Sequence, residues 1–293
     1  MKKTAILGAS GYIGKHLFRR INSIVPDTIG TFCHRHSPGL HHFDLVSQKI
    51  STLKLKENGY SAVIITSGLA NVEQCERERD ATFEVNVKGV LEIVRQLEQL
   101  SLHVLFVSSD YVFDGVTGGY EENSAVGPQT EYGKQKVAVE QGISQLTASY
   151  TIVRLSKIYG VENGDGTFLT DMATTLRHGR KLQAASDQIF CPTYIDDAVN
   201  CIIKILNSGN SGTYHVASPE AWSRYEIAAK LARALGAKID LVESIKLGQI
   251  SGPAKRPLNT SMKCMRIARE RIGEFVSLQE SMQKIATSGE SSV

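Results

Sequence analysis

Ala5-Ile6-Leu7-Gly8-Ala9-Ser10-Gly11-Tyr12-Ile13-Gly14 is the stretch that decides the fold of this chain. An apolar run leads into a turn with glycine at positions 8, 11 and 14. The segment that follows, 12–24, places Ile13, Leu17, Ile21 and Ile24 at helical spacing. This order predicts a buried strand, a tight turn and a helix, and the helix N-terminus can receive a pyrophosphate because glycine lets the backbone approach closely.

Strand-like and helical segments continue to alternate through the first half of the chain. Apolar runs predict strands at 29–33, 63–66, 104–107 and 150–155, and apolar periodicity predicts helices at 82–100 and 132–146. Alternation of this kind is typical of an α/β fold with a Rossmann-type, doubly wound parallel sheet.

The pattern changes after about residue 155. Helices are predicted at 167–178, 195–207 and 223–235, with Asp196 and Asp197 as N-terminal caps of the second. We expect residues 1–155 to form a dinucleotide-binding Rossmann domain and residues 156–293 to be mixed. Segment 195–216 returns to the Rossmann layer, and the remainder builds a smaller C-terminal substrate-binding lobe. The serine-rich last ten residues are expected to fray.

Composition excludes several classes of protein. The 293 residues are 42% hydrophobic and 22% charged, as in ordinary globular proteins, and the net charge of +3 predicts no nucleic-acid partner. The five cysteines lack CxxC spacing and are expected to be reduced, and the eight histidines show no metal-like spacing, so we expect no metal. Because no apolar run approaches about 18 residues and the chain enters a strand directly, we expect no membrane association and a cytoplasmic protein.

Three polar residues downstream suggest one kind of chemistry. Ser109 follows the strand predicted at 104–107, so it should lie at the ligand-binding crevice of the sheet. Tyr132 and Lys136 are one helical turn apart, a pair that alone also occurs on solvated helices. Hydride reduction of a ketone needs a proton donor, and a tyrosine of pKa about 10 can serve if a cation lowers its pKa. We therefore expect Tyr132 to donate the proton, Lys136 to lower the pKa of Tyr132 and hold the nicotinamide ribose, and Ser109 to hydrogen-bond the carbonyl oxygen.

Five motifs together are typical of one family. They are Gly8-x-x-Gly11-x-x-Gly14, Ser108-Ser109-Asp110-Tyr111-Val112-Phe113, Tyr132-Gly133-Lys134-Gln135-Lys136, Asp187-Gln188 followed by Pro192-Thr193, and Arg256-Pro257-x-Asn259. Over nearly its whole length the chain resembles the extended short-chain dehydrogenase/reductases, and within them the dTDP-4-dehydrorhamnose reductase family. The resemblance implies an oxidoreductase that reduces the 4-keto group of a nucleotide-linked 6-deoxyhexose.

The cofactor implied is NADPH in preference to NADH. Where an acid would bind the adenosine ribose 2′-hydroxyl, the chain has Arg35 and Ser37, which suit a 2′-phosphate, although Arg35 could equally point into solvent. The cofactor-binding residues expected from the motifs and the resemblance are Gly8, Ser10, Gly11, Tyr12, Ile13, Gly14, Arg35, Ser37, Asp44, Leu45, Ser67, Gly68, Tyr132 and Lys136.

The substrate-binding residues that the resemblance implies are Ser109, Tyr111, Gln188 and Arg256. The partner is a nucleotide-linked deoxysugar, bound between the lobes against segments 187–193 and 252–259. Two departures from the family occur: Ser109 stands where threonine is more common, and the loop 66–71 differs, which leaves the identity of the sugar open. The sequence does not fix the oligomeric state, and a homodimer is one option.

Two other functions stay open at this point. A sugar-nucleotide dehydratase or epimerase has a related fold, but a dehydratase usually carries Asp-Glu after the catalytic hydroxyl, whereas Tyr111 follows Asp110 here. Segment 108–115 also resembles the regulatory subunit of methionine adenosyltransferase, which binds NADP while serving a partner enzyme. The complete set of Ser109, Tyr132 and Lys136 favours catalysis.

Overall fold

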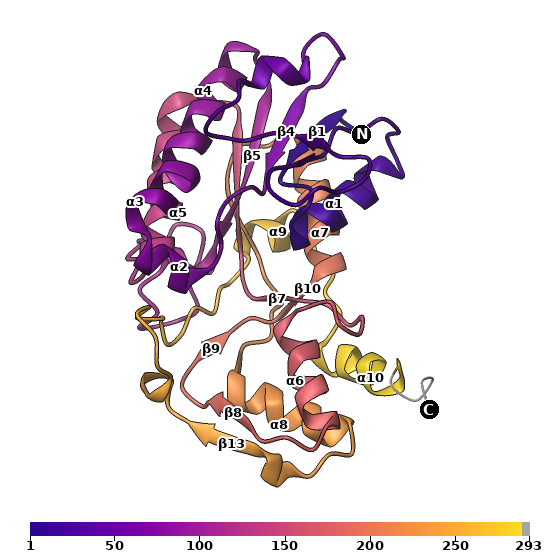
Figure 1. The fold of residues 1–293 in the computed structure, drawn as a ribbon, viewed down its shortest axis with the longest axis vertical. Helices are drawn as coiled ribbons and strands as arrows, with labels where there is room; N and C mark the ends of the chain where they lie inside the picture. Colours follow the sequence, from indigo (N-terminus) through magenta and orange to yellow (C-terminus); the bar gives the residue numbers. More distant parts are fainter. Residues whose placement is uncertain (289–293) are drawn as a thin grey trace.

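The larger of two lobes is built on a parallel five-stranded sheet, shown in the upper half of Figure 1 in a computed structural model that describes residues 1–288. Its strands are β1 (Thr4–Leu7), β4 (Ala62–Ile65), β5 (His103–Ser109), β6 (Tyr150–Leu155) and β11 (Gly212–Val216), in that order across the sheet. Because helices cover both faces, these strands are almost continuously apolar and buried, as the sequence predicted.

Two pairs of helices cover the two faces of the sheet. On one face α1 (Tyr12–Asn22) lies against α7 (Ile195–Ser208), and Ile6, Ile64 and Leu105 of the strands pack under them. On the other face α4 (Val90–Gln99) lies against α5 (Glu131–Leu146), over Leu7, Ile65 and Phe106. The alternate side chains of each strand therefore contribute to two separate cores.

The second strand is shorter than predicted. Only β2 (Thr31–Phe32) pairs with β3 (His41–His42), and Gly30 forms a single bridge to Ile6 at the edge of the sheet. The segment predicted as strand 29–33 is interrupted because the chain turns into the exposed loop that carries Arg35.

The helix predicted at 82–100 is divided in the structure. After α2 (Val72–Arg77), α3 (Arg79–Phe83) is followed by a π-helical turn, η2 (Glu84–Gly89), before α4 begins. The turn brings Asn86 against the loop after β4, where its amide accepts from the N–H of Leu69 at 2.7 Å and donates to the carbonyl of Leu69 at 3.0 Å. Asn86 thus ties this helix to the loop at the sheet edge.

The smaller lobe has its own apolar core between α6 (Phe168–Arg177), α8 (Arg224–Ala234) and α10 (Leu278–Ser288). Short strand pairs surround it: β8 (Leu182–Ala185) with β13 (Val242–Ile245), β9 (Ile189–Phe190) with β12 (Trp222–Ser223), and β7 (Ile158–Tyr159) with β10 (Thr193–Tyr194). The remaining short elements are η1 (Ile50–Leu53), η3 (Asp110–Val112), η4 (Ile239–Leu241), η5 (Leu247–Gln249) and α9 (Met265–Arg269).

Two local predictions are wrong. Neither Asp196 nor Asp197 caps α7, whose N-terminal flank is Tyr194; Asp197 instead accepts from the N–H of Val276 at 2.8 Å, because folding brings the C-terminal segment against it. The last residues do not all fray, since α10 continues to Ser288, where Ile285 is buried in the small lobe. The rest of the predicted frayed end, 289–293, lies outside the described residues.

No helix within residues 1–288 is long and apolar enough to cross a membrane. The five cysteines are free thiols, and the described residues contain no cluster of histidine, cysteine and acidic side chains with metal-binding geometry.

Candidate active site

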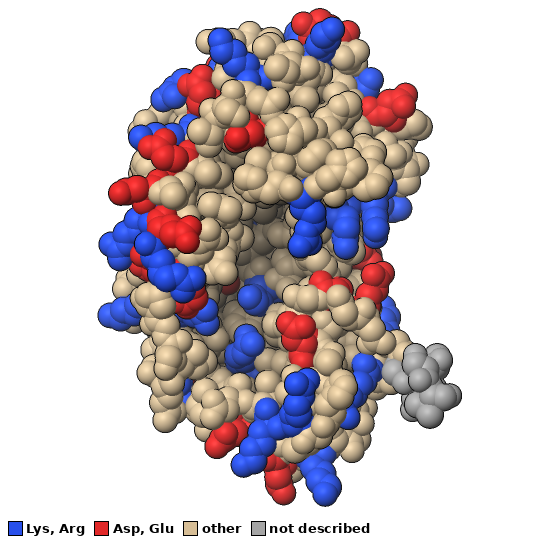
Figure 2. Space-filling model, in the orientation of Figure 1, with Lys and Arg blue, Asp and Glu red and all other residues tan. Residues whose placement is uncertain are grey.

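A hollow between the two lobes is visible in the space-filling view, with lysine and arginine side chains along its walls (Figure 2). It consists of three adjoining cavities. Ser67 and Gly68 line both the cavity beside the glycine turn and the cavity at the end of β5. Asp110, Tyr111 and Lys157 line both the latter and a third cavity toward the smaller lobe.

The glycine turn after β1 fits an anionic group that lies against its backbone. Gly8 has φ +90°, and a Cβ on Gly14 would lie 2.2 Å from the carbonyl oxygen of Gly8, so α1 can approach the strand only with glycine there. Gly11 flanks the N-terminus of α1 and caps it with no side chain. Gly8, Ser10 and Gly11, which lead into this helix end, line the cavity, and the free N–H groups of a helix N-terminus can bind a pyrophosphate.

The structure places most of the predicted cofactor residues around this first cavity. Those that line it are Gly8, Ser10, Gly11, Arg35, Asp44, Leu45, Ser67 and Gly68. Ile13 lines the neighbouring cavity at the end of β5.

Three predicted cofactor residues have other surroundings. Gly14 is buried between helix and strand and serves their packing. Ser37 lies outside the residues that line the cavity, because the loop after β2 carries it away. The hydroxyl of Tyr12 donates to Asp165 Oδ2 at 3.2 Å in the smaller lobe, so its side chain joins the lobes and only its backbone faces the turn.

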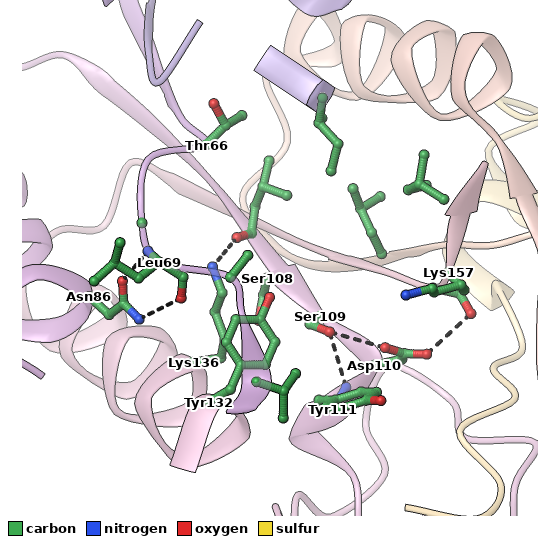
Figure 3. A pocket seen from close by; sticks show the side chains of 18 of the residues that line it. Thr66, Leu69, Asn86, Ser108, Ser109, Asp110, Tyr111, Tyr132, Lys136 and Lys157 are labelled. Atoms are coloured by element: carbon green, nitrogen blue, oxygen red, sulfur yellow. Dashed lines mark hydrogen bonds between the residues drawn. The ribbon is translucent and has the colours of Figure 1, made fainter. Parts of the chain in front are cut away.

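The predicted reductase residues come together at the end of β5 (Figure 3). Ser109 is the last residue of this strand, and Tyr132 and Lys136 project from the first two turns of α5. Thr130 positions that helix by accepting from the N–H of Gly133 at 3.1 Å. Lys136 Nζ donates to the carbonyl of Val107 at 2.9 Å and lies 5.7 Å from the centre of the Tyr132 ring.

Burial shifts the pKa of both helix residues in the direction of the neutral form. It lowers the pKa of Lys136 to about 8, and it raises the pKa of Tyr132 above its usual value, although the neighbouring Ser109 hydroxyl opposes the rise. The expectation that Lys136 lowers the pKa of Tyr132 is therefore corrected, because burial is the largest cause of the shift and it raises this pKa. Tyr132 stays protonated at neutral pH, which is the form that can donate a proton.

Asp110 holds the Ser109 hydroxyl in a buried network that was not predicted from the sequence. Asp110 is 5% exposed, and its Oδ1 accepts from Ser109 Oγ at 3.0 Å. Its Oδ2 accepts from Thr260 Oγ1 at 2.8 Å and from Ser156 Oγ at 3.2 Å. No local pattern could have signalled this network, because its members come from three distant segments of the chain.

The third cavity carries a cluster of cations that was only partly predicted. Tyr111, Gln188 and Arg256 line it as expected, and Lys157 and Arg224 line it as well. Within residues 1–288 the side chains of Lys157 and Arg224 form no ion pair, whereas Arg256 Nη2 pairs with Glu73 Oε1 at 2.9 Å. Burial, followed by repulsion from Arg224, lowers the pKa of Lys157.

Such a cluster suits an anionic ligand, since unpaired cations beside one another are costly without one. A signal for Lys157 was present in the sequence, because it lies two residues after the strand predicted at 150–155, at the ligand-binding edge of the sheet. Arg224 carried no such signal, because only the fold brings it beside Gln188, whose carbonyl accepts from the N–H of Arg224 at 2.9 Å.

A model of the RmlD substrate binding domain matches residues 1–290. The chain belongs to this family. It is 27% identical to the probable low-salt glycan biosynthesis reductase Agl14 of Haloferax volcanii, over 90% of this chain and 91% of that protein. It is also 23% identical to the methionine adenosyltransferase 2 subunit beta of Mus musculus, over 93% of this chain and 84% of that protein.

Solved structures of this family share the whole fold. The crystal structure of dTDP-4-dehydrorhamnose reductase from Bacillus anthracis in complex with NADP superposes with a TM-score of 0.84 at 26% identity, covering 98% of this chain and all of that one. The expected family resemblance and the Rossmann-type fold class are confirmed.

Proposed function

We propose that this protein uses a reduced nicotinamide cofactor to convert the 4-keto group of a nucleotide-linked 6-deoxyhexose into an alcohol. One observation carries the proposal: Ser109, Tyr132 and Lys136 line a single cavity that is continuous with the glycine turn on one side and the cationic cavity on the other. A cofactor and a sugar nucleotide that lie along this hollow would meet at the three side chains.

The side chains divide the chemistry between them. The reduced nicotinamide, when bound, supplies the hydride. Tyr132 donates its proton to the ketone oxygen as negative charge develops there. Ser109 donates a hydrogen bond to the same oxygen, and Lys136, which already donates to the Val107 carbonyl, has further N–H groups for the ribose and for the Tyr132 oxygen.

The nucleotide diphosphate belongs in the third cavity. Arg224, Lys157 and Arg256 supply the positive charge, while Tyr111 and Gln188 contribute polar groups nearer the sugar. Residues 1–155 with 195–216 would bind the cofactor, and the rest would bind the sugar nucleotide. A homodimer is the assembly we propose to test by size-exclusion chromatography with light scattering.

NADPH is the preferred cofactor in this proposal, because the exposed Arg35 lines the cavity beside the end of β2, where a 2′-phosphate would lie. Replacing Arg35 with alanine should weaken binding of NADPH by about 1.5–3 kcal/mol for a lost charge-assisted hydrogen bond, and leave NADH almost unchanged. Calorimetry with both cofactors measures the difference. Equal losses for the two cofactors would show that Arg35 does not contact the phosphate.

The decisive experiment mixes the purified protein with NADPH and a panel of nucleotide-linked 4-keto sugars and follows loss of the reduced cofactor. Turnover with at least one 6-deoxy-4-keto sugar is expected. A second function has support in the likeness to a methionine adenosyltransferase subunit beta. If no sugar is reduced while NADPH and a methionine adenosyltransferase catalytic subunit both bind, the regulatory function replaces the enzymatic one.

A further inference from the structure

Two acceptors compete for the single hydrogen of the Ser109 hydroxyl. In the structure Ser109 Oγ donates to Asp110 Oδ1 at 3.0 Å and accepts from the N–H of Tyr111 at 3.2 Å. A ketone oxygen carries no hydrogen and can only accept. Ser109 therefore cannot serve an ionised Asp110 and a substrate carbonyl at the same time.

Turning the Ser109 hydrogen toward the substrate has a cost if Asp110 is ionised. Two oxygen atoms with lone pairs would then face each other at 3.0 Å in a buried place, and Asp110 Oδ1 would lose its hydrogen bond. A proton on Oδ1 removes this conflict. Asp110 then donates to Ser109, Ser109 donates to the ketone, and Oδ2 still accepts from Ser156 and Thr260 without movement of any heavy atom.

We propose that Asp110 is a positioning residue that works as the neutral carboxylic acid and directs the Ser109 hydrogen to the substrate carbonyl. The inference rests on the proposed reductase function and deepens it. No bond to Asp110 forms or breaks during turnover: its proton stays on Oδ1, and the proton that reaches the product alcohol comes from Tyr132.

The surroundings of Asp110 favour its neutral form. Within residues 1–288 it forms no ion pair, and burial raises its pKa, opposed first by the hydroxyls of Thr260 and Ser109. Lys157, after β6, also opposes the rise from a distance. The other titratable groups that face it are Tyr111 in η3, Tyr132 in α5 and the thiol of Cys191 before β10, none of which supplies a positive charge.

The test compares Asp110→Asn with Asp110→Ala. Asparagine has the same shape, and it can donate from Nδ2 to Ser109 while its oxygen accepts from Ser156 and Thr260, so it imitates the neutral acid at every pH. We expect kcat of Asp110→Asn to fall less than about fivefold, and kcat of Asp110→Ala to fall about 10²-fold, near the effect of losing one oxyanion donor.

The pH profile separates positioning from a purely structural role. Asp110 of the wild type should lose its proton as pH rises, so its kcat/KM should fall through two ionisations, one of Asp110 and one of Lys136, whose pKa is about 8. The Asp110→Asn profile should retain only the second. In a Ser109→Ala background, Asp110→Asn and Asp110→Ala should have equal rates, since Asp110 acts through Ser109.

Other results overturn the inference without touching the proposed function. Loss of rate in Asp110→Asn equal to that in Asp110→Ala, an unchanged pH profile, or unequal rates in the Ser109→Ala background would each do so. If Asp110→Ala does not fold, the pH profile of kcat/KM for Asp110→Asn alone tests the inference. If the wild type reduces no sugar, the reductase function fails, and infrared spectroscopy tests Asp110 separately: a protonated-carboxyl band at pH 7 must disappear in Asp110→Asn.

Discussion

At the scale of single residues, the structure shows that the surroundings of Tyr132 keep its hydroxyl protonated. Its pKa is raised because the phenol is buried, so the hydroxyl keeps its proton over the physiological range. Its effectiveness as a donor then depends on the negative charge that develops on the ketone oxygen and on the position of Ser109. In the proposed reaction, proton transfer would accompany the arrival of hydride and would not require an acidic tyrosine in the free protein.

Tyr132→Phe tests this role, because it keeps the ring and removes only the proton donor. We expect turnover to fall by about 10²–10⁴-fold, while NADPH still binds because Lys136 and the glycine turn are intact. Stopped-flow reduction and fluorescence titration with NADPH measure the two quantities. Tyr225→Phe is the matched control, because it removes a tyrosine hydroxyl from α8, away from the three side chains. Full reductase activity in Tyr132→Phe would refute the mechanism.

At the scale of elements, the glycines of the turn between β1 and α1 have two different roles, one in packing and one in cofactor binding. Gly14 is required for packing, but a Cβ on Gly11 would meet only the Gly8 carbonyl at 3.4 Å, so a side chain is accommodated there. A charged side chain can therefore be introduced at position 11 without preventing α1 from packing against β1.

Gly11→Asp should abolish measurable NADPH binding and leave folding intact, because it places a carboxylate where the pyrophosphate must approach. Gly11→Ala is the matched control and should retain most of the affinity. Calorimetry gives the affinities, and circular dichroism with thermal unfolding shows whether both variants fold. An aspartate variant that binds NADPH as well as the alanine variant does would contradict the placement of the pyrophosphate.

His103, the first residue of β5, should make the free energy of unfolding depend on pH. His103 is buried, with its ring nitrogens 3.0 Å from Ser149 Oγ and 3.0 Å from Thr151 Oγ1, and burial lowers its pKa to about 4. The unfolded chain, with a histidine pKa near 6.5, binds a proton first as pH falls. The free energy of unfolding should therefore decrease between pH 6.5 and 4, by about 2 kcal/mol for this residue alone.

Urea unfolding at pH 7.5 and pH 4.5 measures the loss. His103→Gln should reduce the difference between the two pH values, whereas replacement of the exposed His41 by glutamine should leave it as in the wild type. If His103→Gln retains the full dependence on pH, another group is responsible.

At the scale of the whole molecule, polar contacts join the two lobes beside the hollow that the substrate would enter. Segment 252–257 of the smaller lobe reaches α2 of the larger lobe, where Glu73 pairs with Arg256 at 2.9 Å and accepts from the N–H of Ala254 at 3.2 Å. On the opposite side Tyr12 contacts Asp165. These polar contacts lie next to the site and join the lobes there, beside the buried apolar cluster of Val112, Phe113 and Met262.

Glu73→Ala should loosen segment 252–257. Because the ion pair is partly exposed, we expect the free energy of local opening of this segment to fall by about 1 kcal/mol. That loss corresponds to about fivefold faster hydrogen exchange of its amides. Glu92→Ala, which removes an exposed pair with Arg95 on α4, is the control and should not change exchange there. Unchanged exchange in Glu73→Ala would mean that packing alone holds the segment.

What could be predicted from the sequence is what depends on neighbours along the chain. Periodicity within 150–155 or 195–207, the glycine turn, and the order of Ser109, Tyr132 and Lys136 are local features, because side chains of one face recur at fixed spacing and parallel strands end at one edge. These features indicated the α/β fold, the position of the hollow and the three side chains that meet in it.

Only the tertiary structure decided the partners of those side chains. Asp110 bonds Ser156 from 46 positions away and Thr260 from 150 positions away, and Tyr12 meets Asp165 from 153 positions away. No periodicity encodes such pairs, because folding selects them by bringing distant segments together. The pKa of Tyr132 belongs to the same category: its direction is set by how much water the surrounding segments exclude, a property that no short stretch of sequence contains.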